Sequence, residues 1–347
     1  MGRWFDRWGS TFFAKYTDDE LERDTHRYTD DGTGILWMVT RQFFDEIMHE
    51  CVGRSGHGVG EFPDVKTPMD ALRSDAFMSY VFDYIYRHKE RLFHGVKSKK
   101  TIDSDLNAND FVNIRKFFSF HRPRKVAQFP SKMVRLAVSR LFPDHDAFCP
   151  PLNFHDMSCG FGMREACALL SNFNYYGTDP NAALCLKLNE MGEVLKRLRS
   201  DIVRGRHCIR CQGSETFIPE WEGIMDISFS SPPYFNLEIY SDDGCKSTSN
   251  YGNYGKWLEE YSLPTLKNCV RYLKRGGWLC INVKNLRKYH IYDDYANIVA
   301  SFPEMEMQEP MVLVMDYQKM FEIKCLSERL CDLEGYAEKM MVARKTV

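Results

Sequence analysis

A serine, two prolines and a tyrosine in succession have the clearest chemical potential in this chain. Ser231, Pro232, Pro233 and Tyr234 follow an apolar run that is predicted to be a buried strand over residues 226–230. The two prolines fix the backbone and remove two N–H donors, which leaves rigid carbonyl acceptors. Ser231 adds a hydroxyl acceptor, and Tyr234 adds a face on which a planar base can stack. This set suits the exocyclic amino group of a nucleobase.

Hydrogen bonds from such an amine to the Ser231 hydroxyl and the Pro232 carbonyl would aim the nitrogen lone pair at an electrophile. A sulfonium methyl is already activated, so placement in line supplies most of the rate. Two other interpretations stay open. A Pro-Pro-Tyr ligand for a WW domain requires an exposed polyproline segment, whereas this one follows a buried-looking strand. A purely structural turn is the second.

A glycine turn lies upstream of this segment. A predicted strand ends at Asp156, and Gly160 and Gly162 then lead into a predicted helix over 164–173. Glycines at that place let the backbone approach a ligand. The missing third glycine of GxGxxG weakens the interpretation as a dinucleotide site and is compatible with a ligand without pyrophosphate. Asp179 ends the next predicted strand, where a carboxylate can accept hydrogen bonds from ribose hydroxyls. The alternative is a plain strand–turn–helix with incidental glycines.

Taken together, DMSCGFG, YYGTDPN and SSPPYF resemble the class I S-adenosylmethionine (SAM)-dependent amino-methyltransferases of DNA. The resemblance covers about residues 129–345, and the segment 236–261 is similar to a viral and phage-type subset. It implies SAM as cofactor and methyl transfer to a nucleobase amine. N4-cytosine is favoured over N6-adenine because serine occupies the first position of the turn. The resemblance also implies DNA as the partner.

Several residues of this chain match positions in the family's motifs, and the resemblance implies the same roles for them. Ser231 to Tyr234 match the catalytic turn, and Ser158 stands where the family usually has phenylalanine. The residues that match cofactor-binding positions are Asp156, Ser158, Gly160, Gly162, Asp179, Ser214 and Lys132.

Basic and aromatic residues alternate over 115–125, the best candidate for contact with nucleic acid. A solvated helix face is the alternative. The candidate contacts are Arg115, Lys116, Arg122, Arg124 and Lys125, together with Phe235 after the catalytic turn. Aromatic residues near that turn either line a base pocket or pack in the core: Phe235, Tyr240, Tyr251 and Tyr254.

The elements that must position these residues alternate between strand and helix after residue 128. This pattern predicts an α/β fold with a Rossmann-like, doubly wound, mostly parallel sheet. Residues 1–125 are predicted to be a helical region for recognition or partner contact, and 126–347 the methyltransferase domain. Predicted strands lie at 152–157, 174–179, 207–213, 226–230, 278–283, 311–316 and 336–345; predicted helices lie at 40–52, 69–93, 129–142, 164–173, 183–201 and 257–277.

Composition bounds these hypotheses. With 46 basic and 48 acidic residues the net charge is −2, which excludes a globally basic nucleic-acid coat. The absence of a long apolar run and of a signal-peptide pattern predicts a cytoplasmic or nuclear protein that is neither secreted nor membrane-bound. The twelve cysteines are spread widely, as in a reducing compartment. A single CxxC, Cys208 and Cys211, falls short of a zinc site, so no metal is expected.

Other classes of function fit parts of the pattern. An RNA amino-methyltransferase would use the same chemistry. A non-catalytic subunit with this fold would usually have lost the proline pair or the glycines. Another SAM or nucleotide chemistry, on an already modified base, is the third alternative.

Overall fold

The computed structural model describes residues 2–13, 16–29, 37–51, 62–120, 128–235, 251–314, 323–325 and 337–347. The chain forms two compact units and passes between them several times; one of these boundaries falls inside α3 (Trp37–Glu50). The described part of the first unit comprises residues 2–13, 16, 44–51 and 62–120. The second contains the rest, including 17–29 and 37–43. This division differs from the predicted boundary at 125/126, which assigned those residues to the N-terminal region.

The first unit is helical in its described residues. Its helices are the second part of α3 and four others, α1 (Arg3–Phe12), α4 (Pro68–Arg73), α5 (Asp75–Arg87) and α6 (Ala108–Phe120). The predicted helical segment 69–93 is interrupted at Ser74, which is extended and accepts a hydrogen bond from the Phe77 N–H at 3.2 Å. A serine followed by an aspartate is a typical N-cap, so this residue begins a new helix.

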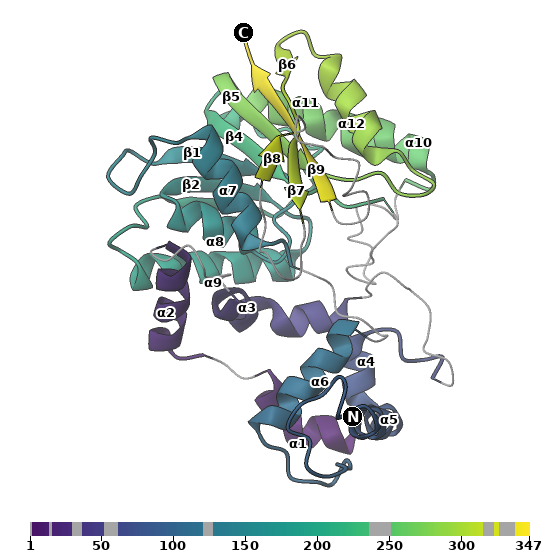
Figure 1. The fold of residues 1–347 in the computed structure, drawn as a ribbon. Coiled ribbons are helices and arrows are strands. Elements are labelled where there is room, and N and C mark those ends of the chain that lie inside the picture. Colours follow the sequence, from purple (N-terminus) through teal and green to yellow (C-terminus); the bar gives the residue numbers. More distant parts are fainter. Residues whose placement is uncertain are drawn as a thin grey trace. The chain divides into compact units, whose positions relative to one another are not determined.

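The second unit is built on one sheet with the order β3-β2-β1-β4-β5-β9-β7-β8, and β6 also pairs with β9 (Figure 1). The strands from β3 to β5 run parallel, and β9 is antiparallel to β5. The predicted Rossmann-like, mostly parallel α/β fold is therefore confirmed. The strands are β1 (Leu152–Asp156), β2 (Phe173–Thr178), β3 (His207–Arg210), β4 (Met225–Ser230), β5 (Leu273–Asn282), β6 (Met305–Met307), β7 (Met311–Val314), β8 (Ile323–Cys325) and β9 (Ala337–Lys345).

Helices cover the sheet in two groups. One group packs near β1–β3 and contains α7 (Ser131–Leu141), α8 (Met163–Leu170) and α9 (Ala182–Leu198). The other packs near β4, β5 and β9 and contains α10 (Tyr254–Trp257), a π-helical turn (Leu258–Ser262), α11 (Leu263–Tyr272) and α12 (Ile291–Ala300). Successive residues of β2 and β4 are nearly all buried, as expected for strands covered on both faces. None of the helices in the described ranges is long and apolar enough to cross a membrane.

The glycine pair at 276–277 does not end a helix as predicted. Helix α11 ends at Tyr272, and the pair lies inside β5. Gly276 has a φ of +82°, next to a register shift between β4 and β5. Glycine tolerates this left-handed conformation, so the pair forms an irregularity in the strand rather than a helix cap.

Helix α2 (Asp18–Thr29) belongs to the sheet unit because it is tied to the end of α9. The guanidinium of Arg199 is buried, and its Nη1 donates to the hydroxyls of Thr25 at 3.3 Å and Thr29 at 3.0 Å. On the surface, Arg197 pairs with Asp18 at 2.5 Å. These bonds join segments about 170 residues apart in the sequence.

Candidate active site

The tips of β1 and β4 are neighbours. The two strands pair in parallel, with Phe154 opposite Ile227 and His155 opposite Ser228. Their carboxyl ends therefore open on the same edge of the sheet, at the point where the strand order reverses. The predicted cofactor turn after β1 and the predicted catalytic turn after β4 thus start side by side.

The cofactor turn has the left-handed backbone that its glycines indicate. Gly160 has a φ of +56° and Gly162 a φ of +69°. Gly162 is the N-cap of α8 and provides no side-chain acceptor for the first N–H groups of that helix. A Cβ at Gly160 would meet no atom nearer than 3.9 Å, so the glycine is required by its φ rather than by crowding.

Asp156 is fully buried and acts as the hub of this turn. Its Oδ1 accepts from the Ser158 N–H at 3.1 Å and from the Ser230 hydroxyl at 2.7 Å. Its Oδ2 accepts from Arg164 Nε at 2.7 Å and from the Tyr175 hydroxyl at 2.8 Å. Both oxygens are therefore occupied by protein donors. The contact with the cofactor that was predicted for Asp156 stays a prediction; the structure gives this residue a role in holding the loop.

Asp179, at the end of β2, also holds the cofactor turn. Its Oδ2 accepts from the Gly160 N–H and its Oδ1 from the Asn181 N–H, both at 3.0 Å. The side chain is 7% exposed, and burial raises the pKa of its carboxyl to about 6. A second link joins the same elements, from the Cys159 N–H to the Thr178 carbonyl at 3.0 Å. Asp179 is thus placed beside the glycine backbone, and its predicted ribose contact stays a prediction.

The catalytic turn remains accessible in part. Ser231, Pro233 and Tyr234 are half-buried, and Pro232 is buried. Ser158 connects this turn to the cofactor turn, because its Oγ lies 2.9 Å from Ser230 Oγ and donates to the Ser231 carbonyl at 3.1 Å. The proline pair is therefore neither sealed in the core nor remote from the glycine turn.

Phe235 is placed differently from its prediction. Its ring is 7% exposed and packs against Tyr254, Trp257 and Tyr289, with ring centroids 5.2–5.7 Å apart. This burial argues against a contact with nucleic acid. Its φ of +46° is unusual for a residue with a side chain. Phe235 therefore anchors the end of the catalytic turn.

The neighbouring aromatic residues serve the core as well. The hydroxyl of Tyr254 donates to Asp294 at 2.6 Å, and Tyr251 packs near Tyr261. Tyr240 lies outside the described residues. These contacts favour ordinary packing for Tyr251 and Tyr254 over a base pocket.

Two of the basic candidates are used within the helical unit. Arg115 donates to the Phe12 carbonyl, with its guanidinium 5.0 Å from the Phe12 ring. Lys116 donates to the Leu92 carbonyl at 2.6 Å. Both are half-buried, which argues against their predicted role as phosphate contacts. The other three candidates, Arg122, Arg124 and Lys125, lie outside the described residues.

The remaining candidates sit on elements that border the site. Ser214 Oγ lies 3.0 Å from Thr265 Oγ1 on α11, and its carbonyl accepts from Asn268. Lys132 lies in the first turn of α7 and is 9% exposed. Their predicted cofactor contacts stay predictions. Of the CxxC pair, Cys208 packs against the core and Cys211 is exposed.

Three residues of the site were missed in the sequence. Arg164 is buried, bonds Asp156 and the Ser158 carbonyl, and lies 5.3 Å from the Phe129 ring. Tyr175 and Ser230 complete the set of Asp156 partners. The available signal was Arg164 beside Glu165 at the start of a largely apolar helix, because a buried arginine requires an acid partner.

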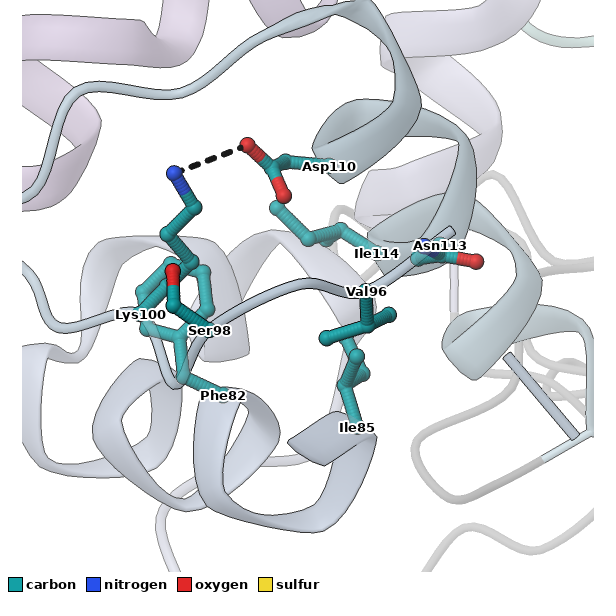
Figure 2. A pocket seen from close by; sticks show the side chains of 8 residues that line it. All are labelled: Phe82, Ile85, Val96, Ser98, Lys100, Asp110, Asn113 and Ile114. Carbon is teal, nitrogen blue, oxygen red and sulfur yellow. Dashed lines mark ion pairs between the residues drawn. The ribbon is translucent and has the colours of Figure 1, made fainter. Parts of the chain in front are cut away.

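A hollow in the helical unit lies between α5, α6 and the segment 96–100 (Figure 2). Its walls include the apolar side chains of Phe82, Ile85 and Val96, and Lys100 pairs with Asp110 at 3.4 Å. None of its lining residues belongs to the predicted catalytic or cofactor sites.

Comparison with known proteins gives likenesses of fold only. No protein family and no curated protein matches the sequence. A SAM-dependent O-methyltransferase from Thermotoga maritima is 10% identical, with 64% of this chain and 68% of that chain covered and a TM-score of 0.39. Magnesium protoporphyrin IX methyltransferase from Synechocystis, solved with SAM, is 13% identical, covering 77% and 96%, at 0.39.

A third similar structure is that of a protein named as a cyclase, not as a methyltransferase. The [4+2]-cyclase SpnF is 14% identical, with 64% of this chain and 83% of that chain covered and a TM-score of 0.37. One fold hosts many chemistries, so function has to be argued from the site. The function proposed below therefore rests on this chain's own topology and contacts.

Proposed function

We propose that this protein transfers a methyl group from SAM to the exocyclic amine of a nucleobase in DNA, with the N4 of cytosine favoured over the N6 of adenine. The observation that carries the proposal is the pairing of β1 with β4, which sets the glycine turn beside the Ser-Pro-Pro-Tyr turn. Hydrogen bonds from Ser158 to Ser230, the last residue of β4, and to Ser231, the first residue of the catalytic turn, support it further.

The residues around the glycine turn fit the cofactor. Asp179 offers a buried carboxylate as acceptor for ribose hydroxyls, beside a backbone that only glycine adopts readily. The uncapped N–H groups at the start of α8 suit the carboxylate of the methionine portion. When bound, SAM supplies an electrophilic methyl group on a sulfonium.

The catalytic turn would do its work by orientation. Ser231 Oγ and the Pro232 carbonyl accept the two N–H bonds of the amine, which turns its lone pair towards the methyl group. The fixed φ angles of Pro232 and Pro233 keep these acceptors in place before the base arrives. Tyr234 holds the base plane by stacking, and a base in a duplex must first be flipped out to reach it. The target amine loses one proton after transfer, and solvent at the half-exposed turn can take it.

The direct test combines binding and turnover. Titration calorimetry with SAM is expected to give heat of binding, which a non-catalytic subunit without a cofactor would not give. Incubation with labelled SAM and separate DNA and RNA pools, followed by mass spectrometry of nucleosides, is expected to yield N4-methylcytosine from DNA. If labelled nucleoside is found in the RNA pool alone, the substrate is RNA and not DNA. Binding of SAM without labelled nucleoside in either pool would contradict the proposal.

A further inference from the structure

The hydroxyl of Ser158 lies between the two turns of the candidate site. Its Oγ is 2.9 Å from Ser230 Oγ and donates to the Ser231 carbonyl at 3.1 Å. Ser230 in turn donates to Asp156 at 2.7 Å. The main chain of Ser158 is held separately, because its N–H bonds Asp156 and its carbonyl accepts from Arg164. Ser158 is thus fixed to the cofactor turn by its backbone and to the catalytic turn by its side chain.

A count of protons shows which of these contacts is decisive. Ser158 and Ser230 supply two hydroxyl hydrogens for three oxygen–oxygen contacts. The hydrogen of Ser230 goes to the carboxylate of Asp156, the strongest acceptor. The hydrogen of Ser158 therefore has two acceptors, Ser230 Oγ and the Ser231 carbonyl. It is the donor to the peptide group that leads into Pro232.

That peptide group sets the direction of both predicted amine acceptors. It joins Ser231 to Pro232, so its plane orients the Ser231 side chain and the Pro232 carbonyl. Because Pro232 and Pro233 have no N–H, the turn cannot brace itself with backbone donors at these two positions. The hydrogen bond from Ser158 to the Ser231 carbonyl therefore holds the turn from outside, and we call this bond the brace.

We propose that Ser158 is a positioning residue that aligns the catalytic turn with the cofactor turn. This inference rests on the proposed function and adds a role for a residue that was matched only to cofactor binding. Misplacement of reacting groups by about 1 Å costs roughly 100-fold in rate. Removal of the hydroxyl should therefore slow methyl transfer far more than it weakens SAM binding.

The experiment uses the full chain and two measurements on each variant. Single-turnover methyl transfer is followed with labelled SAM and the pool that the wild type methylates, and the Kd for SAM is measured by calorimetry. For Ser158→Ala we expect a rate about 10- to 100-fold lower and a Kd within about twofold of the wild type. Ser158→Thr retains the hydroxyl and is expected to recover most of the rate.

Ser228→Ala is the matched control. Ser228 is buried on the same strand as Ser230 but bonds His155 at 2.8 Å, outside the chain from Asp156 to Ser231. The Ser228→Ala variant should be less stable than the wild type, because it loses a buried hydrogen bond. Its rate of methyl transfer should stay within about twofold of the wild-type rate, because the catalytic turn does not move.

Two results would overturn the inference while the proposed function stands. Wild-type rate in Ser158→Ala would show that the brace is dispensable. A Kd that weakens as much as the rate falls would make Ser158 a cofactor contact instead.

Hydrogen exchange gives a readout that does not depend on turnover. In Ser158→Ala, the amides of Tyr234 and Phe235 should exchange faster, and those of α9 should not change. Unchanged exchange in the turn would also overturn the inference. A wild-type protein that neither binds SAM nor transfers methyl would contradict the proposed function, and this exchange arm would still decide whether Ser158 braces the turn.

Discussion

Tyr234 lies at the end of the catalytic turn, half-buried against the core and next to the anchored Phe235. If the ring stacks on the target base, Tyr234→Ala should lower methyl transfer about 5- to 150-fold, the range expected from 1–3 kcal/mol of stacking. Its SAM Kd should barely change. Tyr234→Phe keeps the aromatic face and should keep most of the rate. Equal loss of rate and SAM affinity in the alanine variant would place the ring under the cofactor instead.

The raised pKa of Asp179 predicts that SAM affinity depends on pH. Burial raises the pKa of its carboxyl from 3.8 to about 6. The ionised form is the acceptor that ribose hydroxyls need, so SAM affinity should rise as the pH passes upward through about 6 and then level off. Calorimetry between pH 5 and 7 measures this. Asp179→Asn keeps a neutral side chain at every pH and should bind weakly with a flat profile. A wild-type Kd that does not vary with pH would contradict the ribose contact.

The same shift of pKa affects stability with the opposite sign. The folded protein retains the proton of Asp179 up to about pH 6, whereas the unfolded chain releases it near 3.8. The folded state therefore binds more protons in this window, and this residue's contribution to stability falls as the pH rises from about 4 to about 6. Urea unfolding of the wild type and of Asp179→Asn should differ in this respect, since the variant lacks the titration.

Among the elements, β2 and the cofactor turn are in close contact at Gly177. A Cβ there would come within 2.2 Å of Cys159 Sγ and 2.8 Å of the Tyr175 ring. Gly177→Ala should destabilise the protein by about 1–3 kcal/mol, as overpacking does, and weaken SAM binding because Cys159 belongs to the turn. Thermal unfolding and calorimetry measure both effects. The double variant Gly177→Ala/Cys159→Ala should recover part of each loss, and the absence of any recovery would show that the collision lies with Tyr175.

The parts of the fold that could be predicted from the sequence are those in which local pattern and burial agree. The apolar runs that end at Asp156 and Ser230 have the strand pattern, and both lie in the sheet as expected. Helix α12 was missed because Asp293 and Asp294 in its first turn interrupt the apolar spacing, although acids there stabilise a helix. The start of β5 was missed because its glycine pair resembles a helix end.

Within the site, the sequence predicted the turns but not the bonds between them. Asp156 finds its partners 8, 19 and 74 residues along the chain, in Arg164, Tyr175 and Ser230. No spacing rule connects such distant positions, because the tertiary fold alone brings them together. For the same reason the burial of Phe235 was not predicted, because the aromatic rings that pack against it lie on segments after residue 250.

For the whole molecule, the buried end of Arg199 should matter more than the exposed Arg197. Arg199 is 2% exposed and bonds two threonines of α2, whereas the pair of Arg197 with Asp18 is on the surface. Arg199→Met should lower the free energy of unfolding by about 1–3 kcal/mol, because the hydroxyl oxygens of Thr25 and Thr29 and the carboxylate of Asp201 lose the guanidinium as donor. Arg197→Met, the matched control, should change the free energy of unfolding little, because solvent screens an exposed ion pair. Equal effects in urea unfolding would mean that α2 is not an integral part of the sheet unit.

The long separation between α2 and its partner on α9 has a consequence for synthesis. Thr29 leaves the ribosome 170 residues before Arg199, a delay of roughly 10–30 seconds at ordinary elongation rates. During that time α2 lacks its partner on α9, although the start of α3 is already available, where the N–H groups of Met38 and Val39 donate to Asp24. Its sequence, DDELERDTHRYT, is strongly charged, and its buried apolar side chains are Leu21 and Tyr28, so it exposes little apolar surface to other chains before α9 is made.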